Sequence, residues 1–112
     1  MAARSSTLKP DAMQRQAEIF KALGHPARMG IVHALADGPV CACDLAQAAG
    51  CGLSTASRHL TVLRHAGLIE DDRRGQQIFY RLVFPCVLTF ADCLDRVDAG
   101  EAVRNLRVGC CG

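Results

Sequence analysis

Two short helical segments in close succession, between residues 42 and 65, constrain the fold of this chain most. The first is expected over residues 42–49, where small apolar side chains recur at helical spacing and Gly50 can end the helix. The second is expected from Ser54, as its N-cap, to about His65. Two short helices joined by a glycine-containing turn, the second polar on its outer face, are typical of a helix-turn-helix.

A strand pair is expected directly after this motif. The segments LIEDD (68–72) and IFYRL (78–82) have strand composition, and Arg73-Arg74-Gly75-Gln76 is expected to form the turn between them. A hairpin in this place is a wing. The order of elements therefore predicts a mainly α fold with a β-hairpin wing, a winged helix-turn-helix.

Three more helices are expected around this unit. One spans residues 11–23 with Asp11 as its N-cap, one spans 26–35, and one runs from Cys86 to about residue 106. The middle helix is apolar over most of its surface and is expected to be central. Residues 1–10 are expected to form a flexible arm, residues 11–107 the domain, and residues 108–112 a cysteine-containing tail.

Composition excludes several classes of protein. A chain of 112 residues is long enough for one domain, and no apolar run approaches the ~20 residues of a membrane helix, so no membrane contact is expected. No secretory signal is visible, and seven cysteines are an odd number, which favours reduced thiols in the cytoplasm over a disulfide scaffold. No catalytic set or phosphate loop is present, so no enzyme and no organic cofactor are expected.

The expected surface for double-stranded DNA combines the start of the second short helix with the wing. Polar and basic side chains there can reach base edges or phosphates, whereas the net charge of +2 is uninformative. The candidates are Ser54, Thr55, Ser57, Arg58, His59, Arg73, Arg74 and Gln76. One such unit buries too little surface for tight binding, so a homodimer that reads an inverted-repeat operator is expected, with the first and last helices at its interface.

The segment from Phe20 to Leu82 resembles the ArsR/SmtB family of metal-sensing repressors. The resemblance rests on KALGHPARMGIVHAL and on CACDLAQAAGCGLSTASRHLTVLRHAGLIEDDRRGQQIFYRL, with SxxSRHLxxLRxAGL and the RRG wing as the specific part. It implies a dimeric repressor that leaves its operator when an inducer binds.

Cys41 and Cys43 are the first candidates for inducer ligands. Cys41 stands where the helix over 42–49 needs an N-cap, and a helix N-terminus favours negative charge, so two thiolates there can bind one soft ion. The motif resembles the C-x-C-D-L signature of the arsenite-responsive branch and of the cadmium and lead sensors. The third cysteine of the arsenite branch is replaced here by Ala46, although trivalent arsenic favours three sulfurs.

Four other cysteines can complete such a site. Cys110 and Cys111 form a pair in the tail, which can fold back on either subunit or bind an ion separately. A terminal Cys-Cys with an upstream cysteine resembles family members that sense methylated trivalent arsenicals, and Cys86 matches that upstream position loosely. Cys86 and Cys93, seven residues apart, are less favoured ligands, and Cys51 is expected to be structural.

Histidines are not expected to bind the inducer. The family's zinc and nickel sensors place such ligands on the last helix, and residues 86–107 contain no histidine. His25 is expected at a helix start and His33 in the core.

The leading hypothesis is therefore a DNA-binding repressor released by trivalent arsenic, antimony or a methylated arsenical. One alternative keeps the repressor but makes it a thiol redox or persulfide sensor. A second alternative, from another class, is a cytosolic soft-metal carrier.

Overall fold

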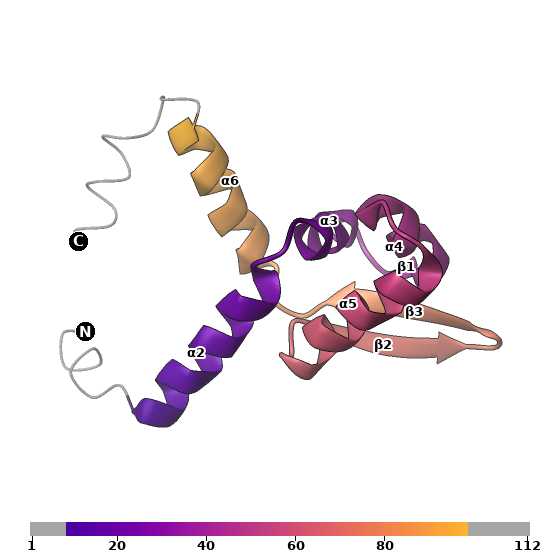
Figure 1. The fold of residues 1–112 in the computed structure, drawn as a ribbon, viewed down its shortest axis with the longest axis horizontal. Helices are drawn as coiled ribbons and strands as arrows, with labels where there is room; N and C mark the ends of the chain where they lie inside the picture. Colours follow the sequence, from indigo (N-terminus) through magenta and orange to yellow (C-terminus); the bar gives the residue numbers. More distant parts are fainter. Residues whose placement is uncertain (1–8, 99–112) are drawn as a thin grey trace.

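The computed structural model describes residues 9–98 and has the mainly helical, winged architecture that the sequence predicts (Figure 1). Its elements are α2 (Pro10–Leu23), α3 (Pro26–Ala34), β1 (Val40–Cys41), α4 (Ala42–Ala49), α5 (Leu53–His65), β2 (Ile69–Arg74), β3 (Gln77–Leu82) and α6 (Cys86–Asp98). The expected tail, the continuation of α6 past Asp98 and most of the expected arm lie outside the described residues.

Helix starts differ from expectation at two places. Helix α2 begins at Pro10, inside the expected arm, and its N-cap is Lys9 instead of Asp11. Proline suits the first turn because its missing N–H has no partner there, and Asp11 still lies in that turn, where negative charge is favoured. Helix α5 begins at Leu53 with Gly52 as N-cap, so Ser54 lies inside the helix and does not cap it.

The core gathers where α3, α4, α5 and β2 meet. Ile31, Leu45, Leu63 and Leu68 are all fully buried there, at 0% exposure. Since α3 supplies two of the fully buried residues, it is central, as its apolar surface predicts. The expectation that His33 lies in the core is wrong, because this side chain of α3 is exposed.

Helices α3 and α4 approach each other closely at Gly30. A Cβ atom at this position would lie 3.1 Å from the backbone oxygen of Ala48, closer than most real contacts of that kind. Helix α4 then ends at Gly50, whose φ of 70° is left-handed and suits a residue without Cβ. The short helix therefore has both its packing and its end fixed by glycine.

The sheet has three antiparallel strands in the order β1-β3-β2, one more than the sequence predicts. The additional strand β1 pairs with the outer side of β3, with Val40 opposite Tyr80 and Cys41 opposite Phe79. The expected four-residue turn is also wrong in extent. Arg73 and Arg74 belong to β2, and only Gly75 and Gln76 connect the strands.

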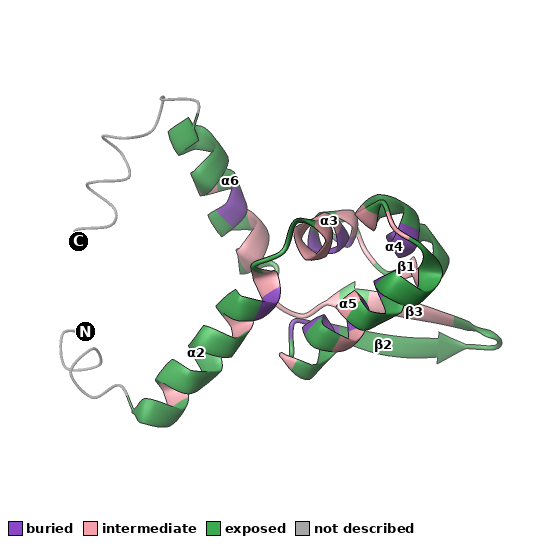
Figure 2. Cartoon of the chain, viewed as in Figure 1, coloured by how far each residue is buried: buried purple, intermediate pink, exposed green. Residues whose placement is uncertain are grey.

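Helices α2 and α6 extend away from the rest of the molecule on the same side (Figure 1). Both are largely exposed (Figure 2), and their exposed residues include large apolar ones. The rings of Phe20 and Phe90 meet edge to face, with centroids 6.1 Å apart, although each residue is more than half exposed. These helices therefore carry the uncovered apolar faces that a dimer interface needs. Among the described residues, no helix has the length and apolar character that crossing a bilayer requires.

Candidate functional site

Helix α5 presents a polar face opposite its buried one. Its inward residues are Ala56, Leu60 and Leu63, as expected, and these are at most 2% exposed. The outward candidates Ser54, Thr55, Ser57 and Arg58 are all exposed. These side chains stand at the N-terminal end of α5, which is the end that meets base edges in helix-turn-helix proteins.

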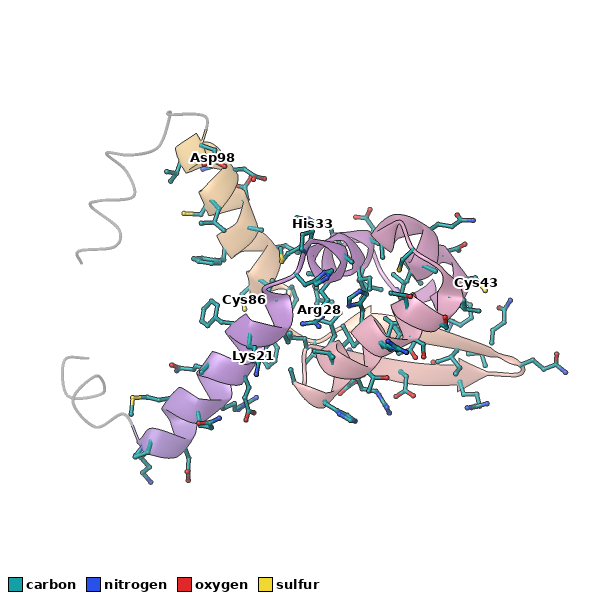
Figure 3. All side chains as sticks on the ribbon, viewed as in Figure 1. Lys21, Arg28, His33, Cys43, Cys86 and Asp98 are labelled. Atoms are coloured by element: carbon teal, nitrogen blue, oxygen red, sulfur yellow. The ribbon has the colours of Figure 1, made fainter. Side chains whose placement is uncertain are left out.

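His59 differs from the other candidates because it is held within the protein. The Nε atom of Arg28 donates to its Nδ1 at 3.2 Å, and the His25 ring lies 4.5 Å away, centroid to centroid. A second nitrogen of Arg28 donates to the backbone oxygen of Ala22 at 3.3 Å. Arg28, labelled in Figure 3, thereby joins α5 to the end of α2 and the start of α3. These contacts tie His59, and with it this part of α5, to α3 and to the segment before it.

The surroundings of His59 also shift its pKa. Burial first, and then the nearby charges of His25 and Arg28, lower the pKa of His59 below 6.5. A lowered histidine pKa means that the unfolded chain binds the proton more readily, so the stabilising contribution is complete above pH 6.5 and lost as the pH falls through the lower folded pKa. Protonation at Nδ1 removes the acceptor for Arg28 and places a positive charge beside its guanidinium.

We therefore expect thermal stability to fall as the pH drops below about 6.5. In Arg28→Ala this fall should be smaller, because the contact is already missing. Melting curves between pH 5 and pH 8 measure it. His65→Gln is the matched control, since it removes a histidine from the end of the same helix. An unchanged pH profile in Arg28→Ala contradicts the assignment.

The wing carries three of the expected DNA contacts. Arg74 is held by Asp72, with Nε and Oδ2 3.0 Å apart, and its guanidinium stacks on Phe79, 4.9 Å from the ring centroid. Arg73 pairs with Ile78 across the strands, and Gln76 lies in the two-residue connection; both are exposed. Because side chains alternate along a strand, Arg73 faces the side opposite to Arg74.

Cys41 and Cys43 lie where β1 passes into α4. Cys41 is the N-cap of α4, as expected, but its side chain makes no capping hydrogen bond. Cys43 lies in the first turn and is exposed; it is labelled in Figure 3. Both cysteines line one open groove of about 190 Å³ together with Leu53, Gln76, Gln77, Ile78 and Ala42. The thiol pair therefore borders both parts of the expected DNA surface.

The other cysteines lie elsewhere. Cys51 is half-buried in the turn between α4 and α5, and Cys93 is half-buried in α6. Cys86 is exposed at the start of α6, on the far side of the molecule from Cys43 in Figure 3. Within residues 9–98, no three His, Cys, Asp or Glu side chains come together as a metal site. Cys110 and Cys111 lie outside the described residues.

Two contacts that shape the site were not identified from the sequence. The pairing of β1 with the wing and the contact of Arg28 with His59 join segments that are far apart in the chain. A two-residue strand has no pattern of its own, and an arginine in the first turn of a helix looks like an ordinary exposed residue. Neither could be found from periodicity.

Comparison with known proteins agrees with this architecture. The model of the family described as bacterial regulatory protein, arsR family, matches residues 25–71, which include α4 and α5. The biofilm growth-associated repressor of Xylella fastidiosa is 42% identical over 66 residues, 59% of this chain and 58% of that protein. The arsenical resistance operon repressor of Escherichia coli is 41% identical over 66 residues, 58% of this chain and 56% of that protein. The chain thus matches little more than half the length of these relatives.

Solved structures extend the likeness over most of the chain. A possible transcriptional regulatory protein (fragment 1–100) from Mycobacterium bovis has a TM-score of 0.71 and 30% identity, over 82% of this chain and 99% of that one. A homodimeric winged helix-turn-helix DNA-binding domain from Mycobacterium bovis has a TM-score of 0.69 and 29% identity, over 88% and 94%. The AntR antimony-specific transcriptional repressor has a TM-score of 0.69 and 31% identity, over 85% and 87%. The chain belongs to the ArsR family of bacterial regulatory proteins, whose matched members are regulators and not enzymes.

Proposed function

We propose that this protein is a transcriptional repressor that binds operator DNA as a homodimer and leaves it when a trivalent metalloid binds Cys41 and Cys43. The observation that carries the proposal is the shared groove of the two cysteines, which borders the wing and the first residue of α5. A ligand in that groove contacts both elements that would touch DNA.

The polar end of α5 supports DNA binding. Its hydroxyl groups and Arg58 are exposed and can bind base edges or phosphates in the major groove. Arg73 and Gln76 on the wing can contact the flanking backbone. Two copies joined through α2 and α6 would place two such surfaces on the half-sites of an inverted repeat.

Trivalent arsenic and antimony, including methylated arsenicals, fit the thiol pair as inducers. Thiolates are soft ligands, and a helix N-terminus favours their negative charge. The names of two relatives, an arsenical resistance repressor and an antimony-specific repressor, agree with this class of ligand. Cys110 and Cys111 remain candidates for a further sulfur, with Cys86 and Cys93 less favoured.

Release would follow from the position of Cys41 in the sheet. Its backbone pairs with Phe79 of β3. A ligand bound to its sulfur would therefore shift the wing as well as the start of α4. A coupling of only about 1–3 kcal/mol between the two sites changes affinity by 5- to 150-fold. A small shift in the wing and α5 is therefore sufficient to release the protein from DNA.

Selection from a pool of random DNA duplexes tests the function with the full chain. The expected outcome is an enriched inverted repeat that the protein binds and that arsenite or antimonite releases at fixed pH and salt. Failure to enrich any duplex, with tight binding of soft metals, identifies a metal carrier instead. Release by mild oxidant, with no response to either metalloid, identifies a redox sensor.

Arg58→Ala is expected to weaken binding to the selected duplex about 5- to 150-fold, equivalent to 1–3 kcal/mol, and to relax preference at one base position. Arg64→Ala removes the same charge from the C-terminal end of α5 and should cost less, without changing the preference. Titrations on the selected duplex and on single-base variants separate the two effects. Equal losses from both substitutions contradict the proposed orientation of the helix.

A further inference from the structure

Helix α5 has two flanks, one on each side of its polar face. With 3.6 residues per turn, Leu53 lies on the flank that faces the wing, where it shares a groove with residues 76–78. His59 and Val62 lie on the opposite flank. There His59 accepts a hydrogen bond from Arg28, and Val62 lines a cleft together with that arginine. The wing therefore borders one side of α5, and the junction of α2 with α3 borders the other.

The cleft on this second flank is basic. It has a volume of about 360 Å³ and is lined by Lys21 of α2, Arg28 of α3 and His65 of α5. Lys21 and Arg28 are labelled in Figure 3, near the meeting point of α2 and α3. Glu18 is the acidic residue among the lining side chains, and it accepts a hydrogen bond from Gln14 at 3.1 Å. Two permanent positive charges against one carboxylate favour a negatively charged partner.

The residues beside the cleft also offer hydrogen-bond donors. Arg28 uses two of its five N–H groups on His59 and on the backbone oxygen of Ala22. His25 accepts at Nδ1 from the backbone N–H of Ala27, 3.0 Å away, and its ring lies 4.5 Å from that of His59, centroid to centroid. An imidazole that accepts at Nδ1 carries its hydrogen at Nε2, so both rings have a donor there. Arginine and imidazole donors are thus grouped on this flank.

We propose that this flank of α5 binds the phosphate backbone of operator DNA on the side of the helix opposite the wing. The binding residues would be Lys21, His25, Arg28 and His59. This inference rests on the proposed function and adds a contact from outside the helix-turn-helix. A helix about 10–12 Å wide fills a major groove about 12 Å wide, so its two sides face the backbones of the two strands. The wing would contact one backbone and this cluster the other.

The cluster lies one helical turn behind the start of α5. His59 follows Thr55 by four residues, which is about 6 Å along the helix axis. Base edges are met by the first turn, so groups placed deeper and to the side are suited to phosphate oxygens. Phosphate contacts carry no sequence information. Substitutions in the cluster should therefore weaken binding to every duplex alike, unlike Arg58→Ala.

The first test removes the charge of Lys21, which is exposed and lies outside the core. Titrations of full-length Lys21→Gln at several salt concentrations use the selected duplex and an unrelated one. We expect affinity to fall about 3- to 10-fold on both duplexes, and the slope of log affinity against log salt to decrease by about 1 for each bound protomer. Lys9→Gln is the matched control, because it removes the same charge about 18 Å away along α2 and should leave the slope unchanged.

The second test separates a DNA contact of His25 from its role as the N-cap of α3. Asparagine is a good N-cap residue, so His25→Asn keeps the cap, but its shorter side chain has no donor at the position of Nε2. We expect affinity to fall about fivefold on both duplexes while the melting temperature stays the same. His33→Asn is the matched control, since His33 is exposed near the other end of α3. Unchanged affinity in His25→Asn contradicts the contact.

Duplexes with one neutral methylphosphonate linkage at a time locate the phosphate. One linkage beside each half-site should weaken binding of the unsubstituted protein and have little effect on Lys21→Gln. If no linkage behaves in this way and Lys21→Gln matches Lys9→Gln at every salt concentration, the phosphate contact is wrong; continued binding of the inverted repeat then keeps the proposed function. If inorganic phosphate stabilises the unsubstituted protein but not Lys21→Gln, with the salt slope unchanged, the cleft binds a free anion instead. If no duplex is bound, the proposed function and this contact are both wrong.

Discussion

Serine in place of both Cys41 and Cys43 is expected to yield a protein that holds its operator DNA at metalloid concentrations that release the unsubstituted protein. The concentration of arsenite or antimonite at half-release should rise by up to about 150-fold, since a coupling of up to 3 kcal/mol is lost. DNA affinity without ligand should stay the same, because neither cysteine makes a hydrogen bond in the cap. Fluorescence anisotropy of labelled operator DNA measures both quantities.

Serine also gives this experiment an internal check on folding. A serine at position 41 can cap α4 with its hydroxyl, which the cysteine does not do, and capping stabilises by about 1 kcal/mol. The melting temperature of the variant should therefore stay the same or rise. Cys51→Ser is the matched control and should respond to the metalloid normally. Undiminished release of the double variant would show that the inducer binds elsewhere, for example at Cys110 and Cys111.

Leu63→Ala is expected to cause the largest loss of stability of any single substitution considered. Leu63 is fully buried, at 0% exposure, on the inner face of α5 and belongs to the core cluster. Truncation of such a leucine leaves a cavity and costs about 3 kcal/mol, a large part of the 5–15 kcal/mol that stabilises a small domain. The melting temperature should fall by more than about 10 °C.

Val62→Ala is the matched control for this substitution. Val62 is the preceding residue of the same helix, is 36% exposed, and should cost less than about 1 kcal/mol. Urea titrations at a fixed protomer concentration compare the two, because the stability of a dimer depends on concentration. DNA affinity of Leu63→Ala, corrected for the unfolded fraction, should stay near normal. A cost of Leu63→Ala as small as that of Val62→Ala would contradict the core that the structure places there.

Much of the fold can be predicted from the sequence because apolar residues recur at helical spacing. The inward residues of α5, the end of α4 at Gly50 and the central position of α3 were all predicted from spacing and confirmed. Helix starts were less certain, since Ser54 and Asp11 have good capping side chains but lie one residue or more inside their helices. A cap depends on where the preceding turn ends, which spacing does not report.

The candidate site could be predicted only as a set of residue types. The polar end of α5 and the Cys-x-Cys motif were visible in the sequence; the first four residues of that polar set are exposed, while of the two cysteines Cys43 is exposed and Cys41 is half-buried. Their relation to the wing was not visible, because it depends on the pairing of Cys41 with Phe79, 38 residues later. The hydrogen bond between Arg28 and His59 is another such contact, 31 residues apart in the chain. Contacts of this kind exist only once the chain is folded.

Gly30, which has no side chain, affects how ligand binding at Cys41 and Cys43 would be transmitted to the wing. Helix α4 packs against α3 with a gap too narrow for a methyl group without some adjustment, so α4 cannot move much closer to α3 at this point. The C-terminal end of α4, where Ala48 meets Gly30, is therefore expected to stay in place when its first turn moves. Displacement of its first turn by a bound ligand would then be carried outward along β1 into the wing, instead of being absorbed in the core.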